Sequence, residues 1–151
     1  GEGQIFDRTI FAASSGGTDV SFSLFLLDEN NPIAPPQHQE VTAQTIKTQL
    51  SASIISGVGA RSAMNAEYLA VLLTANGVNY LMIYNFVYTA NEIIDTTPVS
   101  IITGVTGDIS DVAMSDTHLF YFDGTNIIVR ELNDLNVQLI SQPLAATGIL
   151  S

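Results

Sequence analysis

The sequence predicts an all-β fold made of about three four-stranded antiparallel units. In several segments the apolar side chains alternate with a period of two, which is the period of a strand and not that of a helix. Turns that contain glycine separate these segments. The pattern of strands and turns also recurs about every 50 residues, so the strands are expected to group into repeated units.

The first unit begins with strands and then becomes irregular. Residues 4–14 are expected to form one or two short strands, and residues 15–18 a turn, because Gly16 and Gly17 lie there. Residues 20–27 place alternate apolar side chains on one face of a further strand. Three prolines and two asparagines predict a surface excursion without regular structure over residues 28–40. The segment from residue 40 to residue 50 alternates weakly and carries the one faint helical pattern of the chain.

The second unit contains the strongest hairpin signal. Residues 68–73 are almost continuously apolar, which predicts a strand that is covered on both faces. The dipeptide Asn76-Gly77 predicts a tight turn, and residues 78–88 alternate sharply in the return strand. Residues 97–103 are expected to form a further strand.

The third unit repeats this arrangement. Residues 112–115 predict a short strand of small residues, and residues 117–123 and 126–132 predict two strands rich in aromatic and β-branched side chains. Between the last two lies Asp123-Gly124, a favourable hairpin turn because glycine tolerates positive φ. We therefore assign this turn an architectural role and keep Asp123 as a candidate ligand or interface residue.

A shift of 50 residues aligns the second and third units at three places: Ala63-Met64 with Ala113-Met114, Asn65 with Ser115, and Leu69 with Leu119. Breaks that contain glycine recur between the units. We expect one all-β domain over residues 1–151, with units at about 1–56, 57–103 and 104–148.

This order of a short small-residue strand, a hairpin, an outer strand and a glycine break resembles the β-propeller repeat superfamily. The chain has no Trp-Asp dipeptide, kelch double glycine or sialidase-type Asp box, so the resemblance rests on the pattern alone. It implies that the first strand of each unit, such as residues 63–65, lines a central axis. A β-sandwich is the alternative fold. Propellers usually close with about four to eight blades, so three units predict a homo-oligomer or the remainder of a larger protein.

Composition narrows the classes of partner. The chain has 15 acidic and 4 basic residues and a formal net charge of −11, without a basic cluster. We therefore expect neither nucleic acid nor an anionic membrane as a partner. No apolar run reaches about 18 residues, so we expect no membrane insertion, and the absence of cysteine excludes thiol chemistry and disulfides. A polar surface composed largely of Ser, Thr, Asn and Gln suggests an extracellular or virion location.

Few side chains are candidates for chemistry. His38 lies in the predicted excursion and His118 on a strand, and neither has the spacing of a catalytic or metal site. Turn aspartates provide a faint calcium signal, but the D-x-[DN]-x-[DN]-G pattern is absent and turn formation is the favoured role. The calcium candidates that cluster in sequence are Asp108, Asp111 and Asp116.

Three tyrosines share the predicted face of the strand over residues 78–88: Tyr80, Tyr84 and Tyr88. They would stack sugars if exposed, but their apolar neighbours favour a core or a subunit interface. We accordingly expect a non-enzymatic structural module that assembles at a surface, such as a filament or virion component. The alternative is a carbohydrate- or protein-binding propeller that uses the loops around Asp19, Gly77 and Asp123. A hydrolase with paired carboxylates is the least favoured hypothesis.

Overall fold

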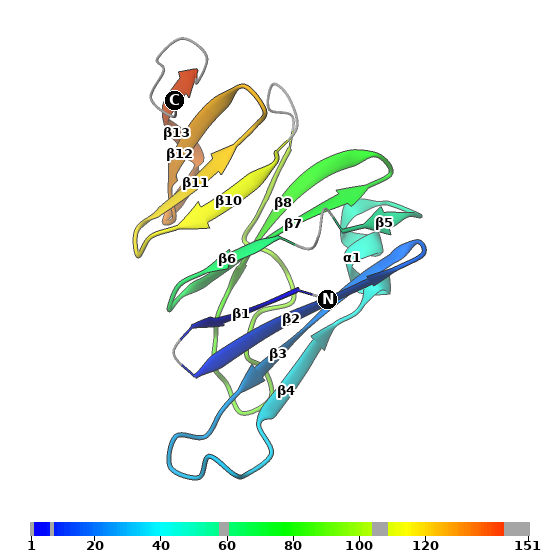
Figure 1. The fold of residues 1–151 in the computed structure, drawn as a ribbon, viewed down its shortest axis with the longest axis vertical. Helices are drawn as coiled ribbons and strands as arrows, with labels where there is room; N and C mark the ends of the chain where they lie inside the picture. The colour runs from blue at the N-terminus through cyan, green and yellow to red at the C-terminus, as the bar shows by residue number, and fades with distance from the viewer. Residues whose placement is uncertain (1, 7, 58–60, 104–108, 144–151) are drawn as a thin grey trace.

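The computed structural model describes residues 2–6, 8–57, 61–103 and 109–143 (Figure 1). It confirms the predicted all-β fold class. The described residues form thirteen strands and one short helix, and the strands make three antiparallel sheets.

The first sheet has four strands that lie in chain order: β1 (Glu2–Phe6), β2 (Thr9–Gly16), β3 (Asp19–Leu26) and β4 (Gln37–Val41). The prediction that residues 28–40 lack regular structure is wrong at the end of that range, because β4 pairs with β3 from Phe22–Val41 to Leu26–Gln37. A strand at the edge of a sheet keeps one side open to polar neighbours, so the polar sequence of β4 is compatible with pairing. The Gln39 side chain accepts hydrogen bonds from the backbone of Ile93 and Ile94, at 2.7 and 2.9 Å.

The helix α1 (Ala43–Leu50) follows β4 directly and is capped at both ends. The hydroxyl of Thr42 accepts a hydrogen bond from the Thr45 amide, and Ser51 ends the helix in the left-handed region with a φ of 52°. Only Ile46 among the helical residues is buried. The helix therefore contributes one fully buried side chain to the core, against which Ala43 and Leu50 pack part-buried, and this explains why its apolar pattern in the sequence is faint.

The second sheet contains β5 (Ile55–Ser56), β6 (Ser62–Met64), β7 (Tyr68–Ala75), β8 (Val78–Asn85) and β9 (Ser100–Ile102). Strands β5 and β6 both pair with β7 and occupy different parts of the same edge, so the sheet is four strands wide. Asn76 and Gly77 have φ values of 48° and 81° in the turn between β7 and β8. Positive φ at both positions is the geometry of a type I′ hairpin, as the dipeptide predicts.

The third sheet has four strands in chain order: β10 (Asp111–Met114), β11 (His118–Phe122), β12 (Asn126–Glu131) and β13 (Asp134–Pro143). Asp123, the first residue of the predicted turn, is buried, and its carboxylate accepts hydrogen bonds from the amides of Thr125 and Asn126, at 2.9 and 2.6 Å. Gly124 has a φ of 93°. This carboxylate thus holds the β11–β12 turn in shape.

The second sheet lies between the other two (Figure 1). One core cluster joins it to the first sheet, where the ring of Phe22 meets that of Tyr84 edge-on at 5.4 Å. A second cluster joins it to the third sheet through residues such as Leu72 and Leu119. Strand β6 also contacts both β1 and β10. The middle sheet is therefore covered on both faces, as the apolar sequence of β7 predicts.

Asn65 connects the second sheet to the third. This side chain is 4% exposed, and its carbonyl oxygen accepts hydrogen bonds of 2.8 Å from the amides of Glu67 and Tyr68. Its amide group donates to the carbonyl oxygen of Ser115, also at 2.8 Å. Ser115 is the position that aligns with Asn65 in the repeat, and its hydroxyl accepts from the amides of Thr117 and His118 in the same way. Equivalent turns of consecutive units therefore touch.

Candidate functional site

The outer face of the third sheet is the main candidate surface. The side chains that alternate with the buried Leu119 and Tyr121 point away from the core and form two rows, each crossing all four strands in register. The first row is Ala113, Phe120, Val129 and Ile140, and the second is Asp111, Phe122, Ile127 and Gln142. We call these eight residues the outer face of the third sheet. Six of them are apolar and belong to neither core cluster.

This face is partly exposed and slightly concave. Phe120, Phe122 and Ile127 border a hollow of about 200 Å³, and Ile140 beside it is 53% exposed. Removal of a continuous apolar surface from water is favourable in free energy. Such a surface favours contact with another apolar surface.

The outer face of the first sheet differs in the size of its side chains. One row is Ile5, Ile10, Phe25 and His38, and the neighbouring row contains Ala12, Ser23 and Glu40. His38, which we expected in an irregular loop, lies on β4 and stacks against Phe25 with ring centroids 4.6 Å apart. Its Nε2 lies 3.2 Å from the Ser23 hydroxyl. This face is more polar than that of the third sheet.

The three tyrosines of the predicted face do not form one surface. Tyr84 is fully buried in the core between the first and second sheets, and burial raises the pKa of its hydroxyl well above the usual value. Tyr80 packs half-buried against the same core. Tyr88 lies beyond the end of β8 and is 40% exposed, with a φ of 49°, and its ring stacks on Phe86 at 5.3 Å. Of the three, Tyr88 alone presents a large exposed area.

The aspartates and histidines considered as metal-binding or catalytic candidates also lie apart from one another. His118 lies at the start of β11, and its Nδ1 is 2.7 Å from the hydroxyl of Thr117. Asp111 and Asp116 are exposed, and Asp108 lies outside the described residues. In the part of the chain that the structure describes, no three His, Cys, Asp or Glu side chains gather as metal ligands.

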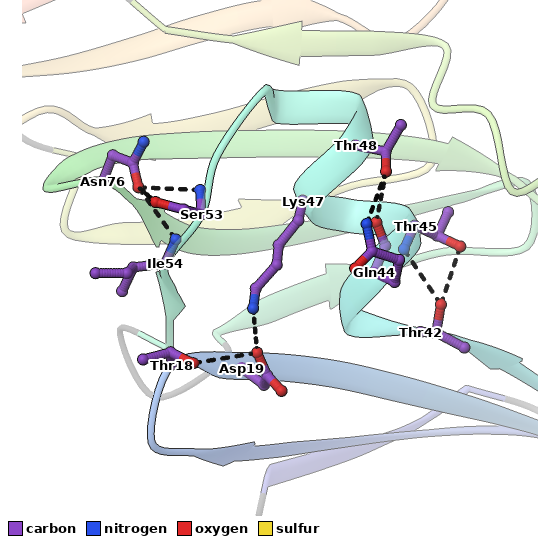
Figure 2. A network of polar contacts seen from close by, with 10 residues as sticks. All are labelled: Thr18, Asp19, Thr42, Gln44, Thr45, Lys47, Thr48, Ser53, Ile54 and Asn76. Carbon is purple, nitrogen blue, oxygen red and sulfur yellow. Dashed lines mark hydrogen bonds and ion pairs between the residues drawn. The ribbon is translucent and has the colours of Figure 1, made fainter.

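A polar network surrounds the helix α1 (Figure 2). Lys47 donates a hydrogen bond to the carboxylate of Asp19 at the start of β3. This bond, together with the charge of Lys47 and a hydrogen bond from Thr18, holds the pKa of Asp19 below its usual value, against an opposing effect of desolvation. Asn76 accepts from the Ser53 and Ile54 amides, at 3.3 and 3.1 Å (Figure 2). These contacts fasten the helix and its following loop to two hairpins.

A polar crevice of about 290 Å³ lies between the second and third sheets. Its lining residues are Tyr68, Asn85, Val99, Ser100, Leu132, Asn133, Asp134, Leu135 and Asn136. Within the described ranges, no hydrogen bond occupies the side-chain amides of Asn85, Asn133 or Asn136. The crevice therefore combines free amide groups with one aromatic ring, and no sequence motif pointed to it.

The sequence matches no family model and no curated protein. Among the described residues, no helix is long and apolar enough to cross a membrane.

Proposed function

We propose that the protein is a non-enzymatic assembly module that associates with another chain through the outer face of the third sheet. The observation that carries this proposal is the contrast between sheets. Both apolar faces of the second sheet are covered by a neighbouring sheet, whereas the apolar rows that cross the third sheet lie outside both cores. A sheet face of this kind is stabilised when a second layer packs on it.

We also propose that the three sheets are blades of a propeller-like array. Two features support it: the first and third sheets follow chain order, and β6 contacts both β1 and β10 as the inner strands of neighbouring blades do. The polar surface, poor in basic residues, supports placing such an assembly outside the cell or on a virion.

The test compares the molecular mass of three proteins by sedimentation equilibrium. The unmodified chain is expected to form an oligomer. A double variant, Phe120→Thr with Val129→Thr, removes apolar area from the outer face but keeps residues that favour strands. It is expected to raise the dissociation constant at least about tenfold, since apolar anchors dominate such interfaces. The matched control, Ile33→Thr, removes an apolar side chain that is 93% exposed in a loop and should leave the oligomer intact.

Circular dichroism of each variant checks that the sheets remain folded. A monomeric unmodified chain at high concentration would overturn the proposal. So would a double variant that associates as strongly as the unmodified chain.

A second candidate function is carbohydrate binding, and the polar crevice between the second and third sheets favours it. Free amides and an aromatic ring are the groups that hold sugar hydroxyls and the apolar faces of sugar rings. A glycan array of the assembled protein tests this candidate, with Asn85→Ala and Asn136→Ala as variants that should lose the signal. An array without signal counts against it.

A further inference from the structure

We propose that the outer face of the third sheet packs against the outer face of the first sheet in a second copy of this chain, so that the contact is head-to-tail. This inference rests on the proposed function and adds the identity and orientation of the partner. It follows from the order of the stack, from the side-chain sizes on the two faces, and from the number of sheets.

The order of the stack gives the direction of the contact. Within one chain, the inner face of the first sheet covers one side of the second sheet, and the other side of the second sheet is covered by the third. The second sheet therefore uses one face to pack on the sheet before it and the opposite face to pack on the sheet after it. The turns at Asn65 and Ser115, which are equivalent in the repeat, meet across the second of these interfaces. If a further sheet is added to the stack in the same order, it covers the outer face of the third sheet. The first sheet of another copy can take that place, because its own outer face is uncovered.

The sizes of the side chains also favour this pairing. The outer face of the third sheet presents the bulky Phe120, Phe122 and Ile127 around its hollow. The outer face of the first sheet places the small Ala12 and Ser23 in the row beside Ile10 and Phe25. Close packing requires large side chains opposite small ones.

The number of sheets predicts the size of the assembly. A contact between different faces leaves both partners with one unused face, so it either closes into a ring or continues without limit. The described residues of two copies supply six sheets, within the range of about four to eight at which propellers close. The expected state is therefore a dimer with two equivalent contacts.

The test mixes two variants that each lose one face. The third-sheet variant is Phe120→Thr with Val129→Thr, and the first-sheet variant is Ile10→Thr with Phe25→Thr. Each variant alone is expected to be a monomer by sedimentation velocity, with a dissociation constant raised at least about tenfold. In the mixture, the intact third-sheet face of one variant meets the intact first-sheet face of the other. A dimer that contains one copy of each variant should therefore form, as native mass spectrometry will show.

The outcomes separate the two proposals. If the first-sheet variant alone dimerises like the unmodified chain, the head-to-tail contact is overturned while the use of the third-sheet face survives. If the third-sheet variant alone remains a dimer, both proposals are overturned.

Cross-linking gives a measurement that does not depend on those substitutions, because the natural chain has no cysteine. Ile140→Cys and His38→Cys place single thiols at exposed positions on β13 and β4. With a short bismaleimide, the mixture of the two proteins should cross-link more than either protein alone. Cross-linking that is strongest within the Ile140→Cys sample would show two third-sheet faces in contact and would overturn the inference.

Discussion

Removal of the Asn65 side chain should loosen the third sheet from the second. In Asn65→Ala, the amides of Glu67 and Tyr68 lose their acceptor and the Ser115 carbonyl loses its donor. Each bond contributes about 1 kcal/mol, and because Glu67 is exposed and Tyr68 half-buried, water replaces part of what is lost. We expect the free energy of unfolding to fall by about 2–3 kcal/mol in urea titrations followed by circular dichroism.

The informative control is Asn65→Ser, which copies the residue at the equivalent position of the third unit. Because the Ser115 hydroxyl accepts from two turn amides, a serine at position 65 should keep both turn bonds and lose only the donor to the third sheet. Its expected cost is about 1 kcal/mol. Hydrogen exchange should then quicken more in the third sheet than in the first. Equal costs for the alanine and serine variants, or an alanine cost below about 0.5 kcal/mol, would refute this reasoning.

Three further predictions concern the core, a turn and alkaline pH. Leu72→Ala, at a fully buried position of β7, should lower the free energy of unfolding by about 2–5 kcal/mol, whereas Ile33→Ala should change it by less than about 0.5 kcal/mol. Gly77→Ala should cost about 1 kcal/mol in thermal unfolding because of its positive φ, while Gly16→Ala, which also meets open space, should cost much less. Since Tyr84 has a raised pKa in the folded protein, only the unfolded state ionises it just above pH 10, and stability should fall as the pH rises further. Absorbance at about 295 nm should show this tyrosine ionising together with unfolding, and Tyr84→Phe should weaken the dependence of stability on pH.

Most strands of the fold were predictable because the order of apolar and polar side chains along a strand indicates which faces of the sheet are covered. The alternation in residues 20–27 corresponds to β3, in which Val20, Phe22 and Leu24 are buried, and the continuous apolar run in residues 68–73 corresponds to β7. The Asn76-Gly77 turn was equally predictable, since its positive φ values follow from those two residue types. These signals are local and need no knowledge of the neighbouring sheets.

The elements that the sequence described poorly depend on distant partners. Strand β4 pairs with β3, and its Gln39 side chain exchanges hydrogen bonds with the backbone of Ile93 and Ile94, which lie more than fifty residues away in the sequence. Its three preceding prolines signalled a loop and hid the strand. Strand β5 lies within the first predicted unit but pairs with β7 of the second sheet. Long-range pairing of this kind leaves no periodic pattern in a segment of two residues.

The candidate surface was hidden for a different reason. The alternation of residues 118–122 places Leu119 and Tyr121 on one face and Phe120 and Phe122 on the other, and all four are apolar or aromatic. In β7, an apolar sequence on both faces means that both are covered by sheets of the same chain. Strand β11 has the same property, but the described residues supply a sheet for only one of its faces. A strand with two apolar faces is most stable when both are covered, so the shared pattern supports the proposed contact, in which a second copy would cover the remaining face.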